Sequence, residues 1–217
     1  MKREEILTRL SECGVVAVIR APSAGVLVDI AKALLQGGVI GIEVTMSTPD
    51  AIGGIEKVVA SLGDQVVVGV GTVLDAATCT AAIHAGARFV VSPVLIPEVI
   101  EATRMQEKVS VPGALSPTEI LTAWSAGADV VKVFPATSMG PQYLRDLLAP
   151  LPFLRLTPTG GVSAKNAGDW IKAGAVMVGA GSTLVTKDAM AHGDWAAITR
   201  NACEFVQAVQ MARTQQA

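Results

Sequence analysis

The stretch WSAGADVVKVF, residues 124–134, decides the fold because it joins the end of a helical pattern directly to a buried strand. Glycine commonly follows the last turn of a helix, since it tolerates the left-handed backbone conformation found there. The Val-rich run after Asp129 is typical of a strand covered on both faces of a parallel sheet. Lys132 interrupts this run, so the stretch also places one amine inside an apolar strand.

Three further segments repeat this order of helix end, glycine and strand. They are LQGGVIGIEV (35–44), IHAGARFVVSP (83–93) and IKAGAVMVGAG (171–181). With the apolar runs between them, they predict eight strands, at residues 15–19, 40–45, 66–71, 89–92, 109–112, 130–134, 154–158 and 176–179. Helical patterns separate these strands, and eight strands alternating with helices predict an α/β fold, a parallel (β/α)8 TIM barrel.

A chain of 217 residues fits one such barrel as a single domain. We expect an N-terminal helix within residues 1–13, a barrel core over 14–185, and a C-terminal helix and tail over 186–217. The first helix is predicted at 4–13 and the last at 195–212.

The repeat also predicts which side chains meet inside the barrel. In each repeat one glycine ends the helix, and five residues after it comes an inward candidate. Counted from Gly38, Gly86, Gly127 and Gly174, these are Glu43, Val91, Lys132 and Gly179. Barrel interiors are filled by layers of four side chains from alternate strands, so we expect these four to form one layer. The second and sixth strands face each other across the axis, which would bring Glu43 and Lys132 together.

This pair suggests covalent chemistry. Withdrawing the Lys132 amine from water disfavours its charged form, and a neutral amine can attack a carbonyl carbon to form an imine. Glu43 could then shuttle the protons that imine formation and carbon-carbon cleavage require. Two alternatives stay open: Lys132 could extend its ammonium to water at the strand end, or the pair could be a purely structural ion pair.

Two glycine-rich segments indicate a phosphate site. TPTGG (157–161) and GAGST (179–183) follow the seventh and eighth strands and are expected directly before helices, where backbone N–H groups bind phosphate in this fold. The candidate phosphate-binding residues are Thr159, Gly160, Gly161, Gly181 and Ser182. Tight turns between strand and helix also need glycine, so each segment alone is a weak signal. Thr72, after Gly71, offers a hydroxyl either to substrate or to its own turn.

Composition excludes several classes of partner. The formal net charge of −2 indicates no basic face for nucleic acid or for an anionic membrane, so we expect a small-molecule partner. No apolar run is long enough for a membrane span, and the charged start does not resemble a signal peptide. The three separated residues Cys13, Cys79 and Cys203 are typical of a reducing, cytoplasmic setting. With only two histidines, a histidine-based metal centre is hard to assemble, and a site made of acidic oxygens alone stays open.

Several motifs together carry a family resemblance. GVVAVIR, GIEVTMSTPDA, GVGTVL, FVVSP, VPGALSPTE, VKVFPA, TPTGGVS and VGAGSTLV occur in this order between residues 14 and 185. They resemble the bacterial 2-keto-3-deoxy-6-phosphogluconate (KDPG) aldolases, which also act on 4-hydroxy-2-oxoglutarate (KHG). The resemblance implies a metal-independent class I aldolase, a homotrimer, with Lys132 forming the imine and Glu43 as general acid and base. It also implies that Thr72, Pro93 and Phe134 line the pyruvate end, and that Gly160, Gly161 and Ser182 hold the phosphate.

One position departs from much of that family. Many members have arginine where this chain has Ser47, and that arginine is associated with the substrate carboxylate. Members without it resemble this chain in ending the first strand with VIR or VLR. Arg20 is therefore the candidate for the carboxylate, because a guanidinium binds a carboxylate through two hydrogen bonds. An ion pair at the rim of the barrel is the alternative role for Arg20.

The sequence thus predicts cleavage of KDPG to pyruvate and glyceraldehyde 3-phosphate, and of KHG to pyruvate and glyoxylate. The epimeric substrate 2-dehydro-3-deoxy-6-phosphogalactonate is an alternative. Two other classes remain: a phosphate-binding barrel isomerase, in which Glu43 is the base and Lys132 only a cation, and a non-catalytic barrel that serves as a binding module.

Overall fold

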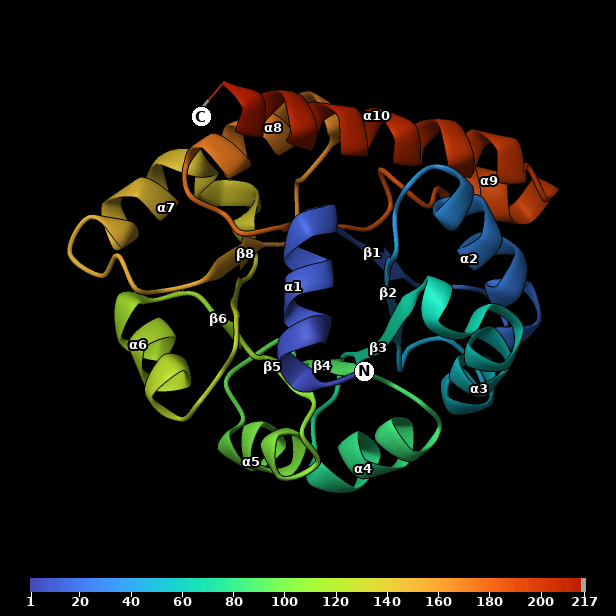
Figure 1. Cartoon of the computed structure of the whole chain (residues 1–217), viewed down its shortest axis with the longest axis horizontal. Coiled ribbons are helices and arrows are strands. Elements are labelled where there is room, and N and C mark those ends of the chain that lie inside the picture. Colours follow the sequence, from blue (N-terminus) through green and yellow to red (C-terminus); the bar gives the residue numbers. More distant parts are fainter. Residues whose placement is uncertain (216–217) are drawn as a thin grey trace.

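The computed structural model describes residues 1–215 as parallel strands that curl strongly and are surrounded by helices (Figure 1). Residues 216–217 of the predicted C-terminal tail lie outside the described part. The strands are β1 (Val15–Ile19), β2 (Gly41–Thr45), β3 (Val67–Gly71), β4 (Phe89–Val91), β5 (Val109–Val111), β6 (Gly113–Ala114), β7 (Val131–Val133), β8 (Leu156–Pro158) and β9 (Val178–Ala180).

The strands form two sheets in which every pairing is parallel. One sheet has the order β5-β4-β3-β2-β1-β9, and the other has the order β6-β7-β8. The predicted α/β class with parallel strands is therefore confirmed. The predicted strand at 109–112 differs, because it ends at Val111 and the chain resumes pairing at Gly113. Pro112 separates the two pieces, since proline has no N–H to donate to a strand ladder.

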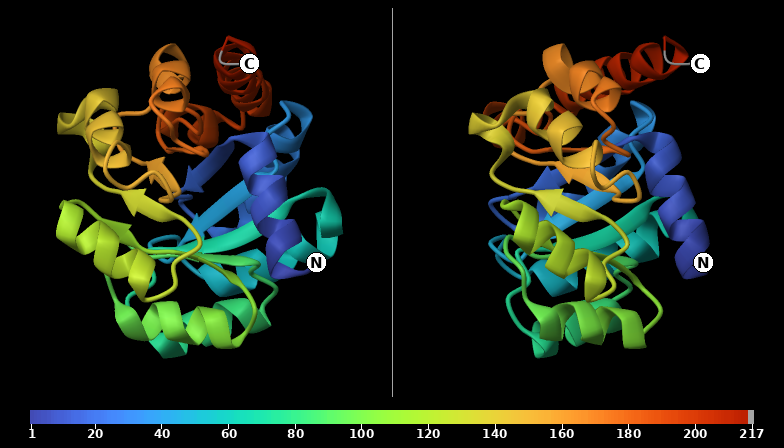
Figure 2. Two further views of the ribbon diagram at one scale, coloured as in Figure 1. Left: turned by 60° about the vertical axis from the view of Figure 1, so that its left-hand side comes forward. Right: turned by 90° about the vertical axis from the view of Figure 1, so that its left-hand side faces the viewer.

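Helices alternate with the strands and lie outside them (Figure 2). They are α1 (Arg3–Cys13), α2 (Leu27–Gln36), α3 (Ala51–Leu62), α4 (Ala76–His84), α5 (Pro97–Met105), α6 (Pro117–Ser125), α7 (Gly140–Leu148), α8 (Ala164–Lys172), α9 (Lys187–His192) and α10 (Trp195–Thr214), with short 3-10 turns η1 (Ala24–Val26), η2 (Gly63–Gln65) and η3 (Ala136–Ser138). Sequence signals explain several boundaries. Proline occupies the first turn of α5, α6 and α7, and Ser116 and Glu119 form a reciprocal cap at the start of α6.

Helix α1 covers the amino ends of the strands (Figure 1). Its side chains Ile6 and Leu10 are fully buried in an apolar cluster with residues such as Val16, Val67 and Met177, which lie at the starts of strands or next to them. Arg3 at its first turn forms an ion pair with Asp129, with Nη2 2.7 Å from Oδ1. The apolar side chains of α1 thus close the space between the strands at their amino ends, so we expect a substrate to reach that space from the carboxyl ends.

None of the helices within residues 1–215 combines the length and apolar character that crossing a membrane requires. The thiols of Cys13, Cys79 and Cys203 are unpaired, and that of Cys79 is buried.

Candidate active site

Glu43 and Lys132 border the same internal cavity. This cavity has a volume of about 10 Å³, room for roughly one water molecule, and is lined by Val16, Glu43, Phe89, Val91, Val111, Lys132, Thr157, Thr159, Met177 and Gly179. All four residues of the predicted layer are among these. The cavity is too small for a sugar acid, so a substrate must approach the pair from the carboxyl ends of the strands.

Lys132 is held at the centre of β7, with Gly113 of β6 and Thr157 of β8 as its register partners. Its neighbours Val131 and Val133 are fully buried on the other face, and the lysine itself is only 4% exposed. The amine Nζ lies 4.8 Å from the centre of the Phe134 ring. Strand alternation therefore aims the amine inward, as the sequence predicted, and one aromatic face lies beside it.

Glu43 occupies the corresponding place in β2, between Val18 of β1 and Gly69 of β3. Its carboxyl group leans over Gly71, where an added Cβ would lie 1.9 Å from Oε1. Oε1 is buried and has no hydrogen-bond partner within residues 1–215. Burial raises the pKa of Glu43, although the positive charges of Lys132 and Arg20 oppose the shift. The carboxyl group can therefore hold a proton at higher pH than an ordinary glutamate, as a general acid must.

The two charged groups share a cavity without touching. Among the ion pairs formed within residues 1–215, none joins Glu43 to Lys132. A structural ion pair would need that contact to offset the desolvation of both groups. The arrangement instead leaves both the amine and the carboxyl group free to react with a third partner.

Thr72, Pro93 and Phe134 lie just beyond the carboxyl ends of β3, β4 and β7. Thr72 has a φ of 61°, a left-handed conformation that is rare for a β-branched residue. Such backbone strain concentrates at functional sites, where the surrounding structure enforces it. The structure thus brings the three residues predicted for the pyruvate end to one rim, together with Lys132.

Arg20 follows β1 and is exposed. Its guanidinium extends toward the loop after β9, because a Cβ added at Gly181 would lie 3.5 Å from Nη1. Ser47 is tied to the end of β2 instead, with its Oγ 2.8 Å from Oγ1 of Thr45, which itself donates to the carbonyl of Ile19. Arg20 therefore places a cation at the carboxyl ends of β1 and β9, while the Ser47 hydroxyl group is used within the turn after β2.

The two glycine-rich loops lie next to each other. Gly160 and Gly161 have φ values of 96° and 71°, and the loop then enters α8 through Ser163. Thr159 is buried over Gly179, where an added Cβ would lie 2.2 Å from Oγ1. The second loop corrects the prediction, because Gly181 and Ser182 open a turn and α9 begins only at Lys187. Only the first loop therefore leads directly into a helix.

Comparison with known proteins gives one consistent result. The family model described as KDPG and KHG aldolase matches residues 6–201. The chain belongs to this aldolase family. A 2-dehydro-3-deoxy-phosphogluconate aldolase of Pseudomonas aeruginosa is 34% identical over 200 residues, 92% of this chain and 90% of that relative. A 2-dehydro-3-deoxy-6-phosphogalactonate aldolase of Escherichia coli is 32% identical over 170 residues, 78% of this chain and 83% of that relative.

A solved structure of the same family supports the fold. KDPG aldolase from Legionella pneumophila, with pyruvate captured at low pH as a covalent carbinolamine intermediate, is 29% identical and has a TM-score of 0.85. The match covers 91% of this chain and 96% of that chain. The aldolase is thus an aldehyde-lyase of the KDPG and KHG type.

Sequence reasoning did not single out two threonines near the candidate site. Thr157 borders the cavity of Glu43 and Lys132, and its inward position follows from strand alternation two residues before Thr159. Thr183 donates from Oγ1 to the carbonyl of Val162, 2.7 Å away, and so connects the two glycine-rich loops. No sequence signal marks that second contact, because it joins segments that meet only after folding.

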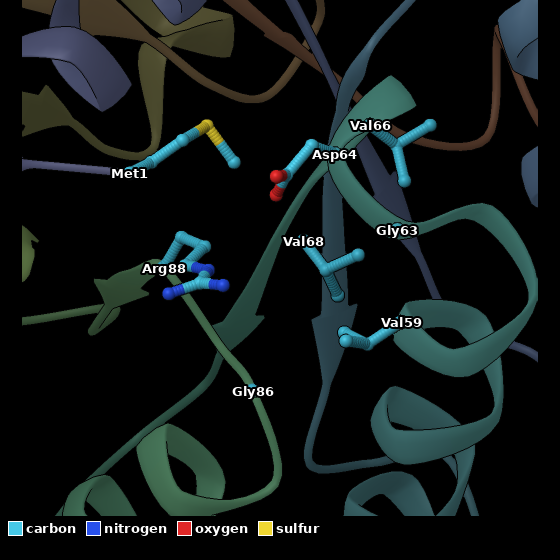
Figure 3. Close-up of a pocket in the computed structure, with 8 residues that line it drawn as sticks. All are labelled: Met1, Val59, Gly63, Asp64, Val66, Val68, Gly86 and Arg88. Atoms are coloured by element: carbon cyan, nitrogen blue, oxygen red, sulfur yellow. The ribbon is translucent and has the colours of Figure 1, made fainter.

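A second pocket lies at the other end of the strands (Figure 3). It is lined by Met1, Val59, Gly63, Asp64, Val66, Val68, Gly86 and Arg88, and it shares no residue with the cavity of Glu43 and Lys132. No group of three or more His, Cys, Asp or Glu side chains within residues 1–215 is arranged to hold a metal ion.

Proposed function

We propose that the chain is a class I aldolase that cleaves KDPG to pyruvate and glyceraldehyde 3-phosphate, and also cleaves KHG to pyruvate and glyoxylate. The observation that carries this proposal is a buried amine and a buried carboxyl group that border one cavity without pairing. Membership of the KDPG and KHG aldolase family supports the same reaction.

The reaction begins with the amine of Lys132. Its lone pair adds to the keto carbon of the substrate, and the carbonyl oxygen takes up a proton to give a carbinolamine. Glu43, whose pKa is raised by burial, then donates a proton to the departing hydroxyl group. Water leaves and a cationic imine remains on Lys132. The carbinolamine described for the Legionella pneumophila relative supports this order of steps.

Cleavage uses the imine as an electron sink. The Glu43 carboxylate removes the proton of the hydroxyl group on carbon four, and the bond between carbons three and four breaks. Its electron pair moves into the imine, which becomes an enamine of pyruvate, while the aldehyde leaves. Glu43 returns the proton to carbon three, and water then hydrolyses the imine to release pyruvate and free Lys132.

The remaining residues bind the substrate in this scheme. Thr72, Pro93 and Phe134 surround the pyruvate end. Arg20 binds a negatively charged group of the substrate, and the carboxylate is the first candidate for that group. Thr159, Gly160, Gly161, Gly181 and Ser182 form the phosphate site. The position of Arg20 beside Gly181 supports a role at this mouth, where Ser47 supplies no charge.

The epimeric sugar acid is the second candidate substrate. The Escherichia coli relative named for 2-dehydro-3-deoxy-6-phosphogalactonate is nearly as similar as the one named for the gluconate. Both substrates share the 2-oxo acid and the phosphate, so one catalytic pair serves either. Comparing kcat/KM for the two epimers and for KHG decides between them.

The proposed enzyme also requires that its two sheets form one barrel. We infer that the two sheets are parts of one closed eight-stranded barrel. Only Pro112 separates β5 from β6, and isolated bridges between Leu156 and Ala175 and between Thr159 and Gly179 support closure between β8 and β9.

We also propose a cytoplasmic enzyme that needs no metal or other cofactor, and a homotrimer. Exposed apolar side chains such as Leu74, Val94 and Phe153 support association between copies.

Reductive trapping tests the central step. The protein is incubated with pyruvate and borohydride, which reduces an imine to a stable amine, and the modified peptide is identified by mass spectrometry. We expect one pyruvate-derived adduct, on Lys132. An isomerase that uses Lys132 only as a cation, or a non-catalytic binding module, would give none, and an adduct on another lysine would contradict the assignment.

A further inference from the structure

Thr183 joins the two glycine-rich loops that follow β8 and β9. Its Oγ1 donates a hydrogen bond of 2.7 Å to the carbonyl oxygen of Val162, twenty-one positions away. Among the hydrogen bonds of residues 1–215, this is the only one from a side chain that connects residues 157–163 to residues 179–185. A backbone bridge between Thr159 and Gly179 joins the two segments where their strands end, and farther along the loops this hydroxyl group supplies the side-chain link.

Each loop is otherwise held by its own surroundings. The amide of Asn166 on α8 donates to the carbonyl of Gly161 over 2.9 Å and accepts from the N–H of Ser163 over 2.8 Å. The second loop closes on itself, because the N–H groups of Leu184 and Val185 both donate to the carbonyl of Gly181. These contacts fix the shape of each loop, and the bridge between Thr159 and Gly179 sets the spacing only where the loops leave their strands.

Both loops contain backbone N–H groups that are not used in hydrogen bonds within the described chain. Within residues 1–215, the N–H groups of Gly161, Ser182 and Thr183 have no hydrogen-bond acceptor. Successive free N–H groups of this kind bind phosphate oxygens. An anion that accepts hydrogen bonds from both loops at once needs them at a fixed separation, and a preformed separation lowers the cost of binding.

We propose that Thr183 is a positioning residue for the phosphate group of the substrate. Its hydroxyl is already used by Val162, so it acts by holding Gly161 and Ser182 at the spacing that phosphate requires rather than by contacting phosphate itself. This inference rests on the proposed phosphate site. It predicts that discrimination between phosphorylated and unphosphorylated 2-oxo acids depends on Thr183.

Valine and serine variants at this position test the inference. Thr183→Val keeps the shape of the side chain and removes the donor, whereas Thr183→Ser keeps the donor. Thr186→Val is the matched control, because that hydroxyl caps α9 through the N–H of Ala189 and does not connect the loops. The first readout is the ratio of kcat/KM for KDPG to kcat/KM for KHG. The second is the rise in melting temperature with inorganic phosphate, which needs no catalysis.

Thr183→Val should lower the kcat/KM ratio by roughly 3- to 10-fold, the effect of losing one hydrogen bond, mainly through KM for KDPG. It should also reduce the stabilisation by phosphate. Thr183→Ser should restore both, and Thr186→Val should change neither. The inference would be overturned if Thr183→Val lowered kcat/KM equally for KDPG and KHG. It would also be overturned if neither the kcat/KM ratio nor the stabilisation by phosphate changed. If the wild type cleaves neither substrate, the proposed function fails, and the phosphate measurement alone decides the role of Thr183.

Discussion

Two carboxyl side chains are buried within residues 1–215, and they lie toward opposite ends of the strands in opposite surroundings. Asp129, just before β7, accepts hydrogen bonds from Nε of Arg3 at 2.9 and 3.0 Å and from the N–H of Ser110 at 2.9 Å. Glu43, in β2, has a buried Oε1 without any partner in the described chain. Their side chains are similarly buried, with 7% and 3% of the residue exposed.

This contrast distinguishes a carboxyl group that stabilises the fold from one that is free to react. At the amino end, every strong acceptor of Asp129 is satisfied, and α1 covers the site with apolar side chains. At the carboxyl end, Glu43 and Lys132 are buried without contacting each other, which costs stability unless a substrate uses them. Burial alone therefore does not identify the reactive group; the missing partner does.

The largest expected effect comes from removing the amine. Lys132→Ala should lower kcat by more than about 10⁴-fold, because no other group is placed to form the imine. Steady-state cleavage assays and borohydride trapping with pyruvate check this together. Cleavage at a rate near that of the wild type would remove Lys132 from the mechanism.

Replacing the unpaired carboxyl group should reduce activity and remove a cost in stability. Glu43→Gln is expected to lower kcat by about 10²–10⁴-fold, the range for loss of a general acid and base. The raised pKa of Glu43 means that, between its ordinary value and the folded value, the folded state holds a proton that the unfolded chain has lost. Wild-type stability therefore falls as pH rises through this window, and Glu43→Gln lacks that fall.

Chemical denaturation of both proteins at several pH values measures this difference. The free energy of unfolding of Glu43→Gln, relative to that of the wild type, should increase as pH rises from acid toward neutral. A difference that does not vary with pH would show that Glu43 is not destabilised by burial.

Gly71→Ala tests the position of the Glu43 carboxyl group without changing the group itself. The new Cβ would lie 1.9 Å from Oε1, so the carboxyl group must move. A displacement of this size is expected to reduce kcat by about 10²-fold while the Lys132 adduct with pyruvate still forms. Kinetics near the wild type would mean that Glu43 has another productive conformation.

Arg20→Ala should have a smaller effect, on binding. Loss of the guanidinium is expected to raise KM for KDPG roughly 5- to 10-fold with little change in kcat, because Arg20 lies at the mouth and not beside the amine. The same measurement with KHG identifies the anion concerned: a shared increase in KM points to the carboxylate, and an increase for KDPG alone points to the phosphate. Unchanged KM for both substrates would leave Arg20 without a role in binding.

The paired carboxyl group should give the smallest effect on activity. Asp129→Ala is expected to reduce the free energy of unfolding by roughly 1–3 kcal/mol, through loss of hydrogen bonds to Arg3 and Ser110, and to leave kcat close to that of the wild type. Thermal unfolding and cleavage assays separate the two quantities. A large loss of kcat in a folded Asp129→Ala protein would show that Asp129, like Glu43, contributes to activity.

Much of this arrangement could be predicted from local patterns. Glycine after each helix, Val-rich strands and the spacing from Gly38 to Glu43 and from Gly127 to Lys132 depend on backbone conformation and strand alternation, which a sequence encodes directly. For the same reason the inward direction of Glu43 and Lys132 was predicted without coordinates.

Other features depend on which segments meet after folding. The division of the sheet at Pro112, the hydrogen bond from Thr183 to Val162 and the turn that delays α9 until Lys187 involve contacts or chain paths with no local signature. The sequence by itself determined an inward amine and an inward acid on separate strands. Only the tertiary structure decided that Asp129 has partners while Oε1 of Glu43 has none among residues 1–215, because pairing depends on distances between segments far apart in the chain.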